Sequence, residues 1–162
     1  MPEAVIVDTV RTPIGRAFKG SLAQLRPDNT GAFIIDQLLE RNPGVNPKDV
    51  EEVFCGVGMP QGKEACNLAR IMVLLSDKLG KETTGVTMSR YCAAGLDAIR
   101  HASNAVKNGE GDIYIAAGVE FVSQFNERTE VAGVDDRHPD LLGENGQPNA
   151  YIDMGITAVN VA

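Results

Sequence analysis

The chain has 162 residues, of which 43% are hydrophobic and 23% are charged. These proportions are typical of a globular protein rather than a disordered one, and the length suits about one domain with its own core. The 15 basic and 22 acidic side chains give a formal net charge of −7. This balance argues against a nucleic-acid-binding protein, because such a protein presents basic side chains to phosphates.

The apolar runs and the cysteines exclude further classes. The longest apolar run, residues 71–75, is far shorter than the roughly 20 residues that span a bilayer, so no membrane partner is expected. Glu3 precedes only a very short apolar stretch, which predicts no signal peptide. Three cysteines without paired spacing favour a reducing cytoplasm over a disulfide framework, and no metal site is predicted.

The first predicted elements are a strand, a long loop and a helix. Residues 4–8 form a short apolar, β-branched run that is typical of a buried strand. Glycines and prolines between residues 11 and 27 predict a long loop. From Thr30 onward, apolar residues at helical spacing predict a helix that ends at the sequence Asn42-Pro43-Gly44.

The next predicted elements place one helix between two strands. The pair Asn46-Pro47 resembles an N-cap followed by Pro at the first helical position, and predicts one short helical turn. Residues 53–57 predict the second strand. After a loop over 58–62, residues 65–76 predict a helix whose apolar middle indicates burial on most sides. Residues 86–89 predict the third strand.

A last helix and strand complete the alternating pattern. Apolar residues at helical spacing between 96 and 106 predict a helix that ends at Asn108-Gly109, with the glycine in the C-cap position. Residues 113–117 predict the fourth strand. Strands that alternate with helices predict an α/β fold with a mostly parallel sheet and right-handed crossovers for residues 1 to about 120.

The composition changes after Gln124. Residues 126–149 are rich in Asn, Asp, Glu, Gly and Pro, and a loop of this length is usually functional or part of a second unit. Residues 153–162 then begin a helical pattern that nothing brings to an end, so we expect the chain to be part of a longer protein. We predict one domain over residues 1–123 and the beginning of a second over 124–162.

Cys92 is the candidate nucleophile. It follows the third predicted strand and precedes Ala93-Ala94-Gly95, where the next helix begins. A side chain at this place projects from the carboxyl end of a parallel strand, where α/β sheets bind their ligands. The helix dipole there favours a thiolate, and the amides of the first turn can donate to an oxyanion. The alternative is a cysteine buried at a junction between elements.

The other cysteines and the histidines do not complete a catalytic set. Cys55 lies in the middle of a predicted strand and Cys66 at the front of an apolar helix, so packing is favoured for both, although a thiol at the edge of a loop can be exposed. His101 would stand about 13 Å along the helix from Cys92, too far to be its base. His138 lies in the polar loop, which favours an exposed turn residue.

Four ordered motifs resemble the thiolases, which comprise the acetyl-CoA acetyltransferases and the 3-ketoacyl-CoA thiolases. Residues 86–99 (VTMSRYCAAGLDAI) resemble the nucleophile signature of that family. Residues 10–15 (VRTPIG) resemble its N-terminal loop, and residues 67–70 (NLAR) the start of its second helix. Residues 117–123 (AGVEFVS) resemble its Gly-Gly-x-Glu-x-Met-Ser turn, with Ala in place of the first Gly and Val in place of Met.

The end of the chain also resembles this family. Tyr151 and residues 154–162 are similar to the opening of a helix in the thiolase loop domain, with Val159 where Glu is usual. The family fold has two similar α/β halves and a loop domain inserted in the first half. By that resemblance, this chain holds most of the first half, without its last strand, and the start of the insertion.

The resemblance implies a CoA-dependent acyltransferase. The Cys92 thiolate would attack a 3-ketoacyl-CoA, keep the acyl group and pass it to coenzyme A, or would serve the condensation of two acetyl-CoA molecules. The Cys92 amide would contribute to an oxyanion hole. Met154 matches a methionine that lines the acyl pocket, although an ordinary core position is an equal alternative. Coenzyme A is a substrate here, so no cofactor is predicted.

The family's remaining catalytic residues lie in a C-terminal half that has no counterpart in this sequence. We therefore expect the chain alone to lack turnover and to need the missing half, another copy in a dimer or tetramer, or both. The alternative is a non-catalytic thiolase-like module that binds acyl-CoA or a partner subunit, motivated by the missing bases and by Val122 and Val159. A ketoacyl synthase also has a nucleophilic cysteine, but the Arg-Thr-Pro and Gly-x-Glu segments favour a thiolase.

Overall fold

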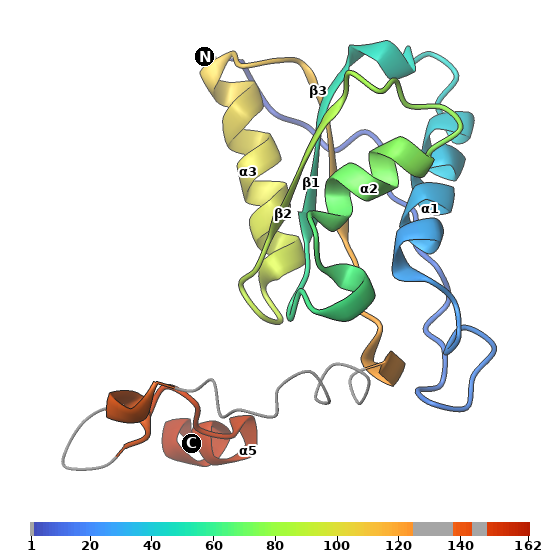
Figure 1. The fold of residues 1–162 in the computed structure, drawn as a ribbon. Helices are drawn as coiled ribbons and strands as arrows, with labels where there is room; N and C mark the ends of the chain where they lie inside the picture. Colours follow the sequence, from blue (N-terminus) through green and yellow to red (C-terminus); the bar gives the residue numbers. More distant parts are fainter. Residues whose placement is uncertain (1, 125–137, 144–148) are drawn as a thin grey trace. The chain divides into compact units, whose positions relative to one another are not determined.

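The computed structural model describes residues 2–124, 138–143 and 149–162. The chain divides into two compact units, Met1–Arg128 and Thr129–Ala162, and the first unit contains the sheet (Figure 1). The predicted boundary between residues 123 and 124 borders a segment outside the described residues and stays a prediction.

The sheet of the first unit has three parallel strands in the order β2-β1-β3. They are β1 (Val50–Gly56), β2 (Thr84–Met88) and β3 (Ile113–Gly118). Gly56, the last residue of β1, pairs with both Met88 and Gly118, the last residues of its two neighbours. The three carboxyl ends are therefore level, and the segments that follow them meet at one edge of the sheet.

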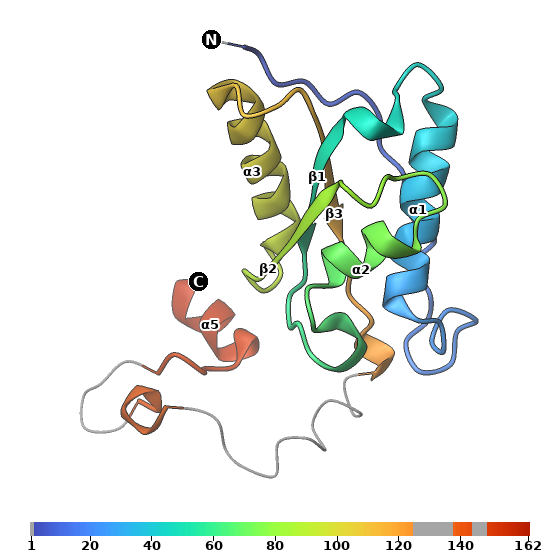
Figure 2. The ribbon, with the colours of Figure 1, turned by 45° about the horizontal axis from the view of Figure 1, so that its top comes forward.

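Helices cover both faces of this sheet, as Figures 1 and 2 show. Helix α2 (Leu68–Leu75) connects β1 to β2 and packs on both strands, and α1 (Pro27–Arg41) packs against α2. Helix α3 (Ala94–Asn108) connects β2 to β3 and lies on the opposite face, against β1 and β3. The predicted α/β fold with a parallel sheet and crossover helices is confirmed.

The central strand β1 is buried on both faces, which explains its apolar run. Val53 and Cys55 belong to the core cluster that the sheet shares with α1 and α2. Phe54, between them, lies against the rings of His101 on α3 and Tyr114 on β3, with centroids 6.1 and 5.7 Å apart. The other core residues of the cluster are Ile35, Leu39, Val50, Val57, Leu68, Ala69, Met72, Val73, Leu79 and Ile115.

The prediction of a strand over residues 4–8 is wrong. Val5, Ile6 and Val7 are 74%, 73% and 77% exposed, and none of the described strands pairs with them. A β-branched run forms a strand only where a neighbouring strand meets its backbone hydrogen-bonding groups. This segment is held instead by Asp8, which accepts hydrogen bonds from Arg41 at 3.0 Å and Asn42 at 2.9 Å at the end of α1.

The helix boundaries differ from the sequence prediction mainly at their starts. Helix α1 begins at Pro27, three residues before Thr30, because Pro at the first position is preorganised for a helix. Its end at Arg41, before the Asn-Pro-Gly sequence, is confirmed. Helix α2 begins only at Leu68 rather than at residue 65, because Cys66 and Asn67 have positive φ angles that a right-handed helix does not allow.

Helix α2 also buries one face instead of most sides. Its residues Leu68, Ala69, Met72 and Val73 are buried, whereas Leu74 and Leu75 are 50% and 45% exposed. The asymmetry arises because α2 covers only one side of the sheet. The sequence of α2 is apolar all round, so it does not reveal which face is buried.

The predicted short helical turn and the predicted glycine C-cap are both confirmed. Pro47–Asp49 forms a short 3₁₀ turn whose N-cap Asn46 accepts a hydrogen bond from the Lys48 amide. Helix α3 ends at Gly109, with φ at 73° as its C-cap position requires. The large apolar residues of α3 do not mark its buried face, however. Leu96 is 72% exposed, and the helix approaches the sheet through Ala98.

The second unit contains two described helical elements. They are a 3₁₀ turn, Pro139–Leu141, and helix α5 (Met154–Val161), which begins after Asp153 as the sequence predicts. Most of the predicted polar loop over 126–149 lies outside the described residues. No helix in the described part of the chain is long and apolar enough to cross a membrane.

Candidate functional site

A cleft of about 460 Å³ lies at the carboxyl edge of the sheet. Its walls come from the segments that follow each of the three strands, which is where parallel α/β sheets bind ligands. We call it the strand-end cleft; it is lined by Gly56, Gly58, Met59, Tyr91, Cys92, Ala94, Gly95, Gly118, Val119, Glu120 and Val122.

Cys92 lines this cleft as a free, exposed thiol. It lies between the end of β2 and the N-cap residue of α3, Ala93. The turn around it is closed by two backbone hydrogen bonds, from the Ala93 amide to Arg90 and from the Ala94 amide to Tyr91, of 3.1 and 3.0 Å. Tyr91 has a φ of 45°, an unusual value for a tyrosine that the turn imposes on it. The sequence prediction of where Cys92 lies is therefore confirmed.

The backbone amides of this turn divide into two groups. The N–H groups of Ala93 and Ala94 are already used within the turn, so they cannot serve the oxyanion as the sequence suggested. The N–H groups of Cys92, Gly95 and Leu96 meet no acceptor among the described residues. They stand at the positive end of the 15-residue helix α3, which favours negative charge beside them.

Gly56 allows α3 to begin close to the end of β1. A Cβ atom at this position would lie 2.2 Å from the carbonyl carbon of Ala94 and 2.3 Å from its oxygen. Both are backbone atoms, so any side chain at position 56 would displace the start of α3. The absence of a side chain here thus sets where the Cys92 turn sits relative to the sheet.

Asp97 links the two sides of the Cys92 turn. Its carboxylate meets Arg90 Nε at 3.1 Å, before the turn, and Arg100 Nε at 2.8 Å, on α3. The hydrogen bond from Arg100 lowers the pKa of this carboxyl, as do the charges of Arg90 and Arg100. Asp97 therefore stays ionised and ties the strand end to the helix.

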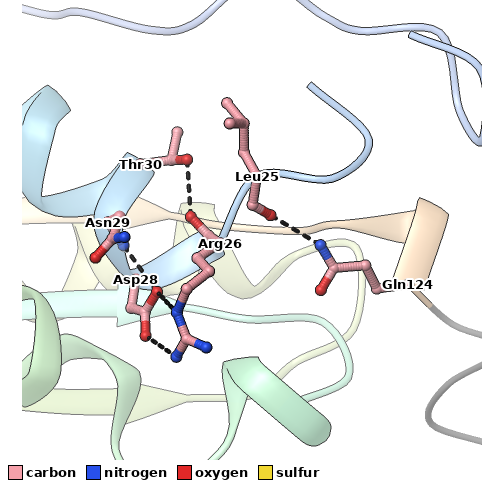
Figure 3. A network of polar contacts seen from close by, with 6 residues as sticks. All are labelled: Leu25, Arg26, Asp28, Asn29, Thr30 and Gln124. Carbon is pink, nitrogen blue, oxygen red and sulfur yellow. Dashed lines mark hydrogen bonds and ion pairs between the residues drawn. The ribbon is translucent and has the colours of Figure 1, made fainter. Parts of the chain in front are cut away.

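The wall that follows β3 is anchored to the loop before α1. Gln124 is buried, and its side-chain amide donates to the carbonyl of Leu25 at 2.8 Å (Figure 3). Beside it, Arg26 forms an ion pair with Asp28 in the first turn of α1, at 2.6 Å. The start of α1 and the end of the β3 segment are therefore held together, next to Val122 of the cleft.

The other two cysteines behave differently from each other. Cys55 is fully buried, and burial raises the pKa of its thiol to about 12, so the predicted role in packing is confirmed. Cys66 is exposed, in a separate hollow of about 370 Å³ that it shares with Asn67, Val86 and Thr87. The favoured interpretation of Cys66 as a packing residue is wrong, because its positive φ of 58° turns it out of the helix.

The histidines do not enter the strand-end cleft among the described residues. His101 lies beside Phe54 and Arg100, with 3.2 Å between its Nε2 and Arg100 Nη2. His138 is an exposed turn residue, as predicted, and its Nδ1 accepts from the Asp140 amide at 3.3 Å. No group of three or more metal-ligating side chains is present in the described part of the chain.

Met154 is the first residue of α5, in the second unit, and is 74% exposed. Its alternative interpretation as an ordinary core residue of the helix stays a prediction as well. A place in the acyl pocket stays a prediction, because the cleft is described within the first unit alone.

Sequence reasoning missed a contact beside the cleft, between Gly58, which lines it, and Ser89, which follows β2. Gly58 and Ser89 were read only as part of a loop and of a motif, yet the Ser89 hydroxyl donates to the Gly58 carbonyl at 2.9 Å. The available signal was their position directly after predicted parallel strands, since such segments converge at one edge of the sheet.

The sequence of this chain is similar to a known protein family and to curated proteins. Residues 4–162 match the family model described as "Thiolase, N-terminal domain". The chain is 45% identical over 122 residues to a beta-ketoadipyl-CoA thiolase of Pseudomonas aeruginosa, covering 75% of this chain and 30% of that protein. It is 36% identical over all 162 residues to a 3-ketoacyl-CoA thiolase of Bacillus subtilis, of which it covers 40%.

A solved structure agrees with these relatives. The crystal structure of the Bacillus anthracis acetyl-CoA acetyltransferase matches with a TM-score of 0.67 and 33% sequence identity, over 74% of this chain and 29% of that one. The chain thus spans about a third of the length of the curated relatives it matches.

Proposed function

The chain belongs to the thiolase family and carries its N-terminal domain, and on that premise we propose that Cys92 is the nucleophile of a CoA-dependent acyltransferase. One observation carries the proposal. Cys92 is a free, exposed thiol in the strand-end cleft, beside N–H groups at the start of α3 that meet no acceptor among the described residues. A thiolate and a nearby oxyanion site are what acyl transfer from a thioester requires.

In the degradative direction, the Cys92 thiolate adds to the ketone carbonyl of a 3-ketoacyl-CoA. The carbonyl oxygen becomes an oxyanion, and we assign its stabilisation to the amide N–H groups of Cys92 and Gly95, two residues that line the cleft. The carbon–carbon bond next to that carbonyl then breaks, and its electron pair leaves with acetyl-CoA, which takes up a proton. The acyl group remains on Cys92 until the thiolate of free coenzyme A removes it.

In the biosynthetic direction the same steps run in reverse, so that two acetyl-CoA molecules condense and one coenzyme A is released. Both directions need an acid and a base. No histidine lines the cleft among the described residues, so we propose that these groups come from the remainder of a longer polypeptide, and that the chain alone lacks full turnover.

The substrate class follows from the relatives, whose names specify CoA thioesters. We propose Met154 as a residue of the acyl pocket and assign the acyltransferase core to residues 1–123, with the loop domain beginning in 124–162. Coenzyme A enters as a substrate, and no further cofactor is proposed. A homodimer or homotetramer, a role in lipid metabolism and a cytoplasmic location complete the proposal; the three free cysteines suit that location.

The acyl-transfer half-reaction is the direct test. The chain is incubated with acetyl-CoA, and the acetyl group is located by mass spectrometry of its peptides. We expect the label on Cys92, retained in the Cys66→Ala variant and lost in Cys92→Ala. Labelling of Cys66 with Cys92 silent would overturn the assignment.

A second candidate is a non-catalytic module that binds acyl-CoA or a partner subunit. It is favoured by the absence of a histidine among those lining residues that the structure describes and by Val122, which lines the cleft where the resembling motif has methionine. This candidate requires acyl-CoA binding without turnover even when a thiolase C-terminal half is supplied. Turnover in that mixture would reject it.

A further inference from the structure

One loop of the strand-end cleft is held from both sides. Gly58, after β1, donates its N–H to Glu120 Oε2 at 2.7 Å, and its carbonyl accepts from the Ser89 hydroxyl at 2.9 Å. Glu120 follows β3, and Ser89 follows β2 directly. Gly58, Glu120 and Ser89 therefore join the segments after all three strands, and we call this group the Gly58 clamp.

The clamp lies where the regular sheet has ended. The strand pairs end at Gly56, and two further backbone bonds extend them by one residue on each side, from Val57 to Met88 and from Val119 to Gly56. Beyond that point the described residues form no further backbone pairs between these segments, so side chains must set the separation of the segments. The clamp supplies these links at the level of the cleft.

The missing side chain at position 58 leaves room for the end of the Glu120 side chain, which would have to shift if a Cβ atom were present. A Cβ atom at position 58 would lie 2.7 Å from Glu120 Oε2, closer than such atoms approach in proteins. The carboxylate therefore rests directly on the backbone of the loop. A charge-assisted hydrogen bond of this kind is stronger than one between neutral groups, so it fixes the loop more firmly.

The segment of Glu120 is itself fixed. The next residue, Phe121, donates its amide to Glu64 Oε1 at 2.6 Å, and Glu64 is only 1% exposed. On the opposite wall, Ser89 precedes the Cys92 turn by one residue and the turn is closed by its own backbone bonds. Movement of the Gly58 loop is thus coupled to both walls of the cleft.

We propose that Glu120 is a positioning residue for Cys92. Its carboxylate holds the Gly58 loop, and through Ser89 that loop holds the strand end from which the Cys92 turn begins. The role rests on the proposed function of Cys92 and assigns to the Glu of the Ala-Gly-Val-Glu segment a task on the backbone rather than on the substrate. It requires an oxygen acceptor at this position, and the negative charge strengthens the hydrogen bond that this acceptor makes.

Two variants separate these requirements. Glu120→Gln keeps a side-chain oxygen that can accept from the Gly58 amide, whereas Glu120→Ala removes it. We expect the rate of Cys92 acetylation by acetyl-CoA to fall by about tenfold or more in Glu120→Ala, since misplacing a reacting group by a fraction of an ångström is costly. We expect Glu120→Gln to recover part of that loss, because its neutral oxygen makes a weaker hydrogen bond.

The other two cysteines serve as internal controls in the same samples. Iodoacetamide alkylation is followed at each thiol by peptide mapping. Cys66 lies in a different hollow and should react at an unchanged rate, whereas buried Cys55 should stay protected unless the core opens. In Glu120→Ala we expect the ratio of Cys92 to Cys66 alkylation to change by about threefold or more, and Glu120→Gln to restore part of it.

A change from the other side of the contact provides a double-mutant cycle. Gly58→Ala forces the Glu120 carboxylate away, so Gly58→Ala and Glu120→Ala should not have additive effects on Cys92. Additive effects of the two substitutions would contradict the clamp. Equal losses in Glu120→Gln and Glu120→Ala, or an unchanged Cys92 rate in Glu120→Ala, would also contradict it. Alkylation of Cys55 would show that the core has opened, and would contradict a role confined to positioning.

Failure of the proposed function is distinguishable from failure of the clamp. If Cys92 is not acetylated even when the unmodified chain is supplied with a thiolase C-terminal half, the acyltransferase assignment falls, but the alkylation ratio still measures whether Glu120 positions the thiol. If acetylation occurs and the ratio stays unchanged across the variants, the clamp alone is overturned.

Discussion

Cys66 and Cys92 occupy the same formal position in two turns of this molecule. Each is an exposed, free thiol, and each stands immediately before the N-cap residue of a helix, Asn67 for α2 and Ala93 for α3. Their surroundings differ. The Cys66 hollow is partly formed by Val86 and Thr87, within strand β2, whereas Cys92 lies beyond the strand ends.

The amides at the two helix starts are also used differently. In α2, the Ala69 amide donates to the hydroxyl of Thr87 at 2.9 Å, and Thr87 in turn donates to the Asn67 side chain at 3.0 Å. In α3, the amides of Gly95 and Leu96 meet no acceptor in the described part of the chain. A cysteine before a helix is therefore not sufficient for a nucleophile; the free amides and the strand-end cleft make the difference.

The largest loss of stability is expected from a substitution that displaces the Cys92 turn from the sheet. Gly56→Ala places a Cβ atom against the backbone of Ala94, and overpacking of this kind costs about 3 kcal/mol in the free energy of unfolding. Urea denaturation measures the loss, and peptide mapping should show altered alkylation of Cys92 with Cys66 unchanged. Gly44→Ala, which meets nothing within 4 Å, is the matched control.

The buried third cysteine sharpens the comparison through pH. Burial raises the pKa of Cys55 from 9.0 to about 12, so the unfolded chain releases this proton first as the pH rises. The stability that the neutral thiol contributes is complete below about pH 9 and is lost between there and about pH 12, at about 1.4 kcal/mol per pH unit. Other groups titrate there too, so the difference from Cys55→Ala isolates the contribution; parallel curves for the two proteins would contradict it.

A smaller effect is expected from freeing an amide on the Cys66 side. Thr87→Val removes the hydroxyl that accepts from Ala69 and should cost about 1 kcal/mol, because the amide loses its partner. Thr87 also lines the Cys66 hollow, so the rate of Cys66 alkylation should change while that of Cys92 does not. Thr84→Val, on the same strand, removes an exposed hydroxyl that bonds to Glu51 and serves as the control for the loss of a threonine.

The smallest change in stability tests the cleft itself. Gly95 lies in the first turn of α3, and a Cβ there would meet nothing within 4 Å, so Gly95→Ala should stabilise the helix by about 0.5 kcal/mol. Gly95 lines the strand-end cleft, so we expect the added methyl group to slow the acetylation of Cys92. Thermal unfolding and the acetylation rate measure the two effects, and a faster reaction would argue that substrate does not pass Gly95.

Several features of the site could be read from the sequence because they depend on local rules. Cys92 was placed correctly because a strand, a turn of small residues and a helix follow one another directly in the chain. The helix ends at Asn42 and Gly109 followed from the preferences of proline and glycine. Cys66 was misjudged because its exposure depends on a positive φ, which no residue type at that position signals.

The Gly58 clamp could not be predicted by such rules. Its three residues are brought together by parallel strands whose order in the sheet, β2-β1-β3, is not the order in the chain. The prediction of a strand over residues 4–8 is wrong for a similar reason. A strand needs a neighbouring strand to pair with, and the local sequence pattern does not show whether one is present.

By itself, the sequence determined the alternation of strands and helices, the membership in the thiolase family and the cysteine that stands at a strand end. The spacing of hydrophobic residues, the residues preferred in turns and the motifs all involve neighbouring residues, so they can be recognised in the sequence. The tertiary structure alone decided which of two exposed thiols faces a cleft, which amides remain available and which carboxylate holds the loop opposite. These depend on contacts between segments far apart in sequence, where packing rather than local preference sets the geometry.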